Sequence, residues 1–297
     1  MAITAAMVKE LREMTGAGMM DCKKALNETN GNMDEAVEFL RKNGQAKAEK
    51  KASRIAAEGL CMVVTKDDQT AAVVEVNSET DFVAKNATFQ EFVKAVATQA
   101  VNSDAADMDA FMAEKWNEDA SKTVSEALVE KVAVIGENLK IRRFEKVVAE
   151  HGCVVPYVHG GGRIGVIVDA DTDVVNDTVK EAMHNIAMQI AALNPKYVSR
   201  DEVSADYIAH EKEILLAQIM NDPKESQKPE KVINGMIEGR ISKELKEVCL
   251  VDQVYVKAED GKQTVAKYLE EVSKAVDGTV KVKRFVRFET GEGLEKK

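Results

Sequence analysis

The sequence predicts an α+β fold with an N-terminal three-helix bundle, a duplicated core of antiparallel sheet with covering helices, and an inserted antiparallel coiled-coil arm. Three observations predict it. Apolar residues recur at helical spacing in three short runs before residue 45. A strand–turn–strand–helix pattern occurs twice between residues 60 and 193. A heptad-like apolar repeat, broken by a proline-containing turn, fills residues 201–249.

The first ~45 residues are expected to form three short helices. The first begins after Thr4, whose hydroxyl can cap it. The second starts at Met19 and ends at Asn30-Gly31, and the third starts at Asn32 and is expected to end at Asn43-Gly44. This pattern resembles a ubiquitin-associated-like bundle. Because so short a segment has a marginal core, we expect it to dock onto a partner or domain.

Basic residues in this region allow two interpretations. Arg12 and Lys23 either lie on a solvated helix face or contact a partner. The segment Lys47–Arg54 (KAEKKASR) is expected to be a helical, solvated connector, although it could touch phosphate.

The two copies of the core pattern align without a gap. Val74–Val83 and Val166–Val175 share five of ten residues, and Asn77 faces Asp169. Each copy follows a strand and a turn and precedes an amphipathic helix. We therefore expect two related units, each a hairpin covered by a helix.

The most informative segment is Glu75–Lys85 (EVNSETDFVAK). It ends an apolar strand, supplies turn and helix-cap chemistry at Ser78–Asp81, and then places Phe82 where a chain usually turns polar. A phenylalanine at such a corner either packs into the core or projects toward a partner. Its counterpart in the second copy is Val174, so the aromatic occurs in one copy only. That difference favours the projecting interpretation.

The remaining patterns complete the arm and the core. Residues 123–134 predict a helix and residues 139–144 an alternating strand. The arm is expected to turn at Pro223 and Pro229. Its expected apolar seam consists of Val203, Tyr207, His210, Ile214 and Ala217 going out, and of Ile233, Ile237, Ile241 and Leu245 returning. The chain then returns to the core through residues 250–256, a helix over 264–276 and a strand over 280–288.

These elements predict five segments. They are 1–54, the helical domain and basic connector; 55–148, the first repeat; 149–200, the second repeat; 201–249, the coiled-coil hairpin; and 250–297, the return to the core.

Composition limits the possible functions. Hydrophobic residues (45%) and charged residues (31%) are in the proportions of a globular protein, and 297 residues allow two or three structural units. A net charge of −10 argues against an extended nucleic-acid face. Four well-separated cysteines are typical of reduced cytosolic thiols. The charged N-terminal segment and the lack of long apolar runs predict neither a secretory signal nor a membrane span, so we expect a cytoplasmic protein.

No catalytic constellation can be assembled from the sequence. The histidines at 151, 159, 184 and 210 have neither metal-ligand spacing nor an adjacent nucleophile. Gly160–Arg163 lacks the Lys-Ser/Thr of a phosphate-binding loop and is expected to be a hairpin turn. His159 is either a hydrogen-bonded turn residue or a partner contact. We expect no catalytic residue, no metal, no cofactor and no direct nucleotide binding.

Several strings resemble bacterial elongation factor Ts, the nucleotide-exchange factor of elongation factor Tu, over essentially the full length. These strings are Leu11–Leu26, Thr80–Val83 (TDFV), Ile135–Asn138 (IGEN), Arg163–Val166 (RIGV) and Arg287–Gly293. One departure is local. The family commonly has Gln-Pro-Phe-Val where this chain has Gln253–Val256 (QVYV), which leaves the conformation of that loop open.

The resemblance implies guanine-nucleotide exchange without chemistry of its own. The implied partner is elongation factor Tu, in its GDP-bound and nucleotide-free states. The implied wedge is Phe82, inserted between helices of the partner's GTPase domain and displacing the elements that bind its Mg²⁺. The other implied contacts are Thr80, Asp81 and Val83 at the same tip, Arg12 and Lys23 on the GTPase domain, and Ile135, Gly136, His159 and Val256 on the partner's far domain.

The rival interpretation is an RNA- or ribosome-binding adaptor that uses Lys47–Arg54 and the arm. It predicts an affinity that falls steeply with salt, and the negative net charge counts against it. A metabolic enzyme ranks third.

Overall fold

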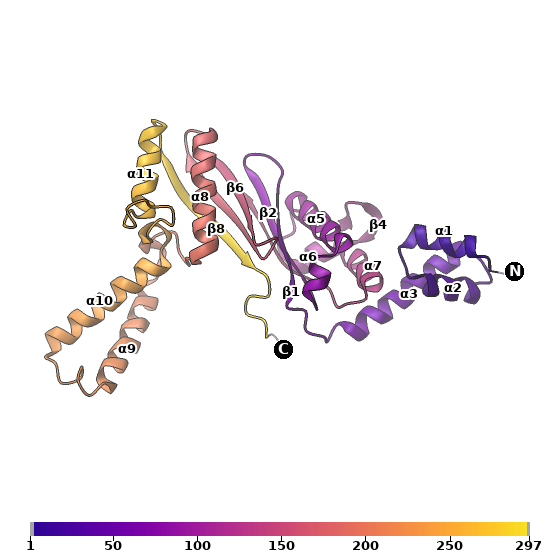
Figure 1. The fold of residues 1–297 in the computed structure, drawn as a ribbon, viewed down its shortest axis with the longest axis horizontal. Helices are drawn as coiled ribbons and strands as arrows, with labels where there is room; N and C mark the ends of the chain where they lie inside the picture. The colour runs from indigo at the N-terminus through magenta and orange to yellow at the C-terminus, as the bar shows by residue number, and fades with distance from the viewer. Residues whose placement is uncertain (1–2, 296–297) are drawn as a thin grey trace.

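The computed structural model describes residues 3–295 and shows an elongated molecule with a layered core (Figure 1). Two three-stranded antiparallel sheets lie face to face, and a helix covers the outer face of each: α5 (Ala87–Asn102) on one, α8 (Asp177–Leu193) on the other. The predicted α+β class is confirmed. The segments predicted as 1–54 and 250–297 also include residues 1–2 and 296–297, which lie outside the described residues.

The first sheet has the strand order β1-β2-β5. Its central strand alternates in the expected way: Val74 and Val76 pack against α5, whereas Ala71 and Val73 face the second sheet. A small two-stranded sheet and α7 lie on the side toward the N-terminal helices (Figure 1). The further elements of this unit are β1 Glu58–Thr65, β2 Thr70–Ser78, α4 Asp81–Ala84, α6 Met108–Ala113, β3 Lys115–Trp116, β4 Asp119–Thr123, α7 Val124–Ile135 and β5 Lys140–Val148.

The second sheet repeats this arrangement with the order β6-β7-β8. Val166 and Val168 pack against α8, and Ile167 faces the first sheet. The duplicated segments thus fall on the two central strands and the turns that follow them. The third strand comes from the C-terminal part of the chain, after the helical hairpin. The elements are β6 Cys153–His159, β7 Ile164–Thr172, η1 Arg200–Glu202, η2 Leu250–Asp252, α11 Val265–Ala275 and β8 Val280–Glu289.

Three helices precede the sheets and enclose a small core of their own. They are α1 Ala5–Thr15, α2 Met19–Glu28 and α3 Met33–Lys51. The predicted cap at Thr4 and the predicted start of the third helix at Asn32 are confirmed, but the predicted end of that helix at Asn43-Gly44 is wrong, because α3 continues to Lys51. Gly44 is buried against α7, where an added Cβ would lie 3.4 Å from Cβ of Ala133. Helix packing at this point offsets the about 1 kcal/mol that glycine costs inside a helix.

A helical hairpin, α9 (Ala205–Asn221) and α10 (Glu230–Val248), projects from the second unit (Figure 1). The predicted seam of the returning helix is confirmed, since Ile233, Ile237, Ile241 and Leu245 are buried. The predicted outgoing seam is wrong for His210, Ile214 and Ala217, which are exposed; the contacts come from Tyr207, Ile208, Leu215 and Ile219. Val203 precedes the N-cap Ser204 and lies outside α9, so counting helical turns from Val203 does not give the face of α9 that is buried.

A buried carboxylate joins the two units. Glu75 of β2 is 0% exposed and lies on the face turned toward the second sheet. Its oxygens accept hydrogen bonds from Arg142 (3.0 Å), from Arg143 (2.6 Å) and from the Gly291 N–H (2.8 Å) beyond β8. Both arginines also bond to the residues around Glu292, at the end of the second unit. At the equivalent position the second repeat has the apolar Ile167.

Hydrogen bonding keeps this carboxylate ionised. Burial by itself would raise the pKa of Glu75, but the bonds from Gly291 and Asn77 and the two arginines outweigh it and hold the pKa below its ordinary value. A group with a depressed folded-state pKa contributes stability above its unfolded pKa, about 4.3 for glutamate. That contribution disappears as the pH falls through the folded-state pKa.

We predict that Glu75→Gln lowers the free energy of unfolding by about 3–5 kcal/mol at neutral pH, because it leaves two arginines without their buried partner. The stability of the wild type should fall below about pH 4.3 more steeply than that of the variant. Urea unfolding at a series of pH values measures both. Glu150→Gln, which breaks an exposed ion pair with Lys283, is the control and should cost far less than Glu75→Gln, because exposed ion pairs contribute little. Equal losses in the free energy of unfolding for Glu75→Gln and Glu150→Gln would contradict the role of Glu75 as the buried charge that joins the two units.

Candidate partner-binding site

A short, capped helix presents Phe82 to solvent. After β2 ends at Ser78, the Thr80 hydroxyl accepts a hydrogen bond from the Val83 N–H (3.4 Å) and caps α4. Val83 and Ala84 turn toward the first core, and Phe82 on the opposite side is 81% exposed. The projecting position expected for Phe82 is therefore the observed one. We call residues 79–83 the tip.

A carboxylate from another element fixes the tip. Glu137, just after α7, accepts hydrogen bonds from the N–H groups of Glu79 (3.0 Å) and Thr80 (3.1 Å) and from the Thr80 hydroxyl (2.7 Å). In return, the Glu79 carboxylate accepts from the Asn138 N–H (2.6 Å) and pairs with Arg54 (3.4 Å). These bonds join segments almost 60 residues apart, so the tip is held by tertiary contacts as well as by its own cap.

Asp81 of the tip takes no part in these hydrogen bonds with Glu137 and Asn138. Its carboxylate accepts a hydrogen bond from Lys85 Nζ (2.6 Å) at the helical i, i+4 spacing, and this bond lowers the pKa of Asp81. The Asp81 side chain is about half exposed and directly precedes the exposed Phe82. The tip therefore offers an apolar ring and a negative charge on the same short helix.

Ile135 and Gly136 lie beside the tip, because they directly precede Glu137. Gly136 ends α7 with a left-handed backbone (φ +88°), and its carbonyl accepts a hydrogen bond from Lys51 Nζ (2.6 Å). The expected contacts with the partner's far domain were Ile135, Gly136, His159 and Val256 together. His159 and Val256 belong to the second unit, so the predicted group is divided between the two halves of the molecule.

Arg12 and Lys23 are exposed on the N-terminal helices. Two apolar neighbours on α2 are exposed with them, Met19 at 50% and Met20 at 74%. Sequence alone gives no sign of this exposure, because large apolar side chains on a helix usually face a core. Exposed methionines beside basic residues are instead typical of an adaptable binding surface.

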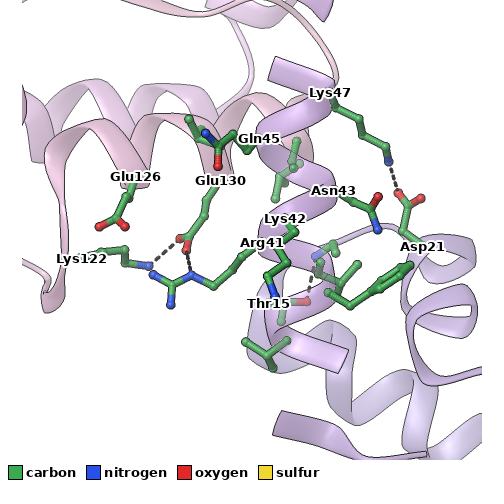
Figure 2. A pocket seen from close by; sticks show the side chains of 18 of the residues that line it. Thr15, Asp21, Arg41, Lys42, Asn43, Gln45, Lys47, Lys122, Glu126 and Glu130 are labelled. Atoms are coloured by element: carbon green, nitrogen blue, oxygen red, sulfur yellow. Dashed lines mark hydrogen bonds and ion pairs between the residues drawn. The ribbon is translucent and has the colours of Figure 1, made fainter. Parts of the chain in front are cut away.

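A crevice of about 600 Å³ separates these helices from α7 (Figure 2). Arg41 of α3 and Lys122 approach Glu130 of α7 from two sides, at 3.7 Å and 2.5 Å. On the other side of α3, Lys47 pairs with Asp21 (2.9 Å). Charges of both signs line this crevice in pairs.

His159 and Val256 are both positioned by side chains of the second unit. His159 Nδ1 is hydrogen-bonded to the Tyr157 hydroxyl (2.8 Å), and the edge of His184 packs on Tyr157. The exposed Val256 donates its N–H to Oε1 of the buried Gln189 (2.7 Å). These contacts orient the His159 side chain and fix the backbone at Val256.

The Val256 loop keeps a defined shape without the proline. Gln189 Nε2 donates to the Val254 carbonyl (3.0 Å), and the loop pairs with residues 263–265 through the N–H groups of Tyr255 and Val265. Gln253 has φ −64° and ψ 150°, the conformation that precedes a proline. Hydrogen bonds from α8 and from the segment before α11 therefore hold the conformation of this loop.

No helix between residues 3 and 295 combines the length and the apolar character needed to cross a membrane. Over the same range, no cluster of three or more His, Cys, Asp or Glu side chains is arranged to hold a metal ion. What the tip and the N-terminal helices present instead are exposed apolar side chains on rigid supports, which is the geometry of a protein-binding surface.

Comparison with known proteins identifies the family. The sequence model of the family "Elongation factor TS" matches residues 79–292, beginning at the tip. The chain is 53% identical over 296 residues to "Elongation factor Ts" of Clostridioides difficile (strain 630), covering 99% of this chain and 95% of that one. It is 50% identical, with the same coverage, to the protein of that name from Clostridium novyi (strain NT). The chain therefore belongs to the elongation factor Ts family of translation factors.

We predict that Glu137→Gln speeds hydrogen–deuterium exchange at the Glu79 and Thr80 amides by about tenfold or more, because hydrogen bonds to a charged acceptor contribute about 1.5–3 kcal/mol. Glu126→Gln, which alters the capping box at the other end of α7, is the control and should leave the tip amides unchanged. An unchanged rate of hydrogen–deuterium exchange at the Thr80 amide of Glu137→Gln would show that Glu137 does not hold the tip.

We predict that Val254→Pro raises the free energy of unfolding by about 0.4–1 kcal/mol, because the backbone before it already suits proline and the pairing does not use the Val254 N–H. Chemical denaturation measures the change. Val256→Pro is the contrasting variant and should destabilise, since it removes the bond to Gln189. A loss of stability in Val254→Pro would contradict this description of the loop.

Proposed function

We propose that this chain binds GDP-bound elongation factor Tu and promotes GDP release and GTP rebinding. Membership of the elongation factor Ts family supports the partner and the exchange role. The observation that carries the residue assignment is Phe82, which is exposed on a tip that Glu137 holds in place. We expect the protein to act in the cytoplasm, where translation takes place.

Exchange requires a difference in affinity. A factor that binds the nucleotide-free state of elongation factor Tu more tightly than the GDP-bound state must weaken GDP binding by the same ratio. Mg²⁺ held with the nucleotide is the largest local charge in such a site, so displacing its ligands is an effective way to weaken binding. The chain itself need not bind nucleotide.

The tip is the proposed wedge. Phe82 would insert between helices of the GTPase domain, with Thr80, Asp81 and Val83 fixing its direction. Ile135 and Gly136 lie beside the tip and would contact the same domain. Phe82 can displace groups of the partner only if its own backbone stays in place, and the hydrogen bonds that Glu137 accepts from Glu79 and Thr80 would hold it there.

Two further surfaces would hold the partner while the wedge acts. Arg12 and Lys23, with the exposed Met19 and Met20, form a mixed basic and apolar surface suited to the GTPase domain. On the second unit, His159 and Val256 would contact the far domain. The N-terminal helices would serve as a ubiquitin-associated-like module and the α9–α10 hairpin as a coiled-coil arm.

The rival adaptor function has lost support. Its basic segment would need free cations, but three of its four cations are engaged within the chain: Lys47 pairs with Asp21, Lys51 with the Gly136 carbonyl, and Arg54 with Glu79, which leaves the exposed Lys50. These contacts use the segment to hold the protein together.

We predict that the wild-type chain accelerates release of a fluorescent GDP analogue from elongation factor Tu, and that Phe82→Ala loses most of this acceleration. Truncating a central aromatic anchor costs about 2–4 kcal/mol of binding free energy. The fold should be retained, because the ring is exposed. Stopped-flow fluorescence measures the rates and circular dichroism checks the fold.

The matched control is Val174→Ala, at the equivalent position of the second repeat, which should leave the rate unchanged. Full acceleration by Phe82→Ala would move the wedge to another residue. No acceleration by the wild type would overturn the proposed exchange function.

A further inference from the structure

The end of α7 contacts the N-terminal helices at three points. Ala133 packs against Gly44 of α3, where an added Cβ would be 3.4 Å away. Val134 lies against the turn between α1 and α2, with its Cγ2 3.6 Å from an added Cβ on Gly16. The Gly136 carbonyl accepts the bond from Lys51 at the end of α3. An ion pair of Glu130 with Arg41 of α3 reinforces this contact one turn earlier (Figure 2).

The next two residues hold the tip. Glu137 accepts the bonds from Glu79 and Thr80, and Asn138 donates its N–H to the Glu79 carboxylate. The Asn138 side chain also donates to the Arg54 carbonyl (2.8 Å), just beyond α3. The segment 133–138 therefore contacts the N-terminal helices at one end and the tip at the other. We call it the bracket.

The Gly44 contact determines the spacing. A glycine in the middle of a 19-residue helix costs stability unless close packing requires it. At this buried point of contact, on the edge of the crevice, α3 and α7 leave room for a single methyl group on residue 44, whose Cβ would lie 3.4 Å from that of Ala133. A larger side chain would force the helices apart, and the N-terminal helices carrying Arg12 and Lys23 would move with α3.

We infer that the bracket fixes the distance between the N-terminal helices and the tip, so that Gly44 is a positioning residue for partner binding. This inference rests on the proposed function. Two contact surfaces held at a fixed separation bind as one pre-organised unit, because the first contact already orients the second and little further entropy is lost. No opening between the N-terminal helices and α7 is needed for exchange.

The direct test is a reversible lock, Gly44→Cys with Ala133→Cys. Their Cβ separation of about 3.4 Å is close to the ~3.5–4.5 Å of disulfides. The four native cysteines are all buried and should not compete. We expect the disulfide to form readily. The oxidised protein should accelerate GDP release within about threefold of its own reduced form.

Two results of this test would overturn the inference. Failure of the disulfide to form would show that the helices do not keep this spacing. An oxidised form that loses exchange about tenfold or more and recovers on reduction would show that the N-terminal helices must move.

The second test separates the helices with Gly44→Leu. We expect its half-saturating concentration of elongation factor Tu to rise about tenfold, with little change in the maximal rate. In this background Arg12→Ala should have little further effect, whereas it weakens binding in the wild type. Gly239→Leu, in an open position of α10, is the matched control and should bind normally.

Unchanged binding by Gly44→Leu, or full additivity with Arg12→Ala, would contradict the positioning role. If the wild type does not accelerate GDP release, the proposed function fails. Disulfide formation still reports the spacing of α3 and α7, so the two failures can be distinguished.

Discussion

A buried charge that must be paired sets the constraint on which the rest of this fold depends. The two repeats have the same strand order, but one carries Glu75 where the other carries Ile167. A carboxylate removed from water is tolerated only with full hydrogen bonding. Its partners come from β5 of its own unit and from Gly291, beyond the last strand of the other. Asn77 of β2 donates a further bond, so docking of the second unit buries the charge and completes its hydrogen bonding through Gly291. The docked pair forms the frame that carries the other parts.

The proposed binding surface is built onto this frame by a few polar contacts rather than by a large core. The helix that carries the tip, α4, is only four residues long and could not hold a direction by itself. Glu137 holds the tip through hydrogen bonds, and the residues just before it contact α3: Ala133 at Gly44, and Gly136 at Lys51. In the proposed function this rigidity matters, because an aromatic side chain that is to insert into a partner must not be pushed aside.

Local patterns predicted much of this structure. The strands, the duplication, the cap at Thr4, the helix start at Asn32 and the outward Phe82 follow from alternation, capping chemistry and comparison of the two repeats. The failures lie where a distant neighbour decides. Gly44 looks like a helix stop until Ala133 is placed beside it. The outgoing seam of the hairpin depends on where α9 begins, and Glu137 gives no sign in the sequence that its partners lie almost 60 residues earlier.

The central claim is that this chain stabilises the nucleotide-free state of elongation factor Tu. The most direct test is to measure its affinity for the nucleotide-free and the GDP-bound forms by titration calorimetry, and the affinity of GDP for elongation factor Tu with and without the chain. The account predicts tighter binding to the nucleotide-free form, by the same factor by which the chain weakens GDP binding. Equal affinity for the two forms would contradict it, because such a protein cannot shift the equilibrium however tightly it binds.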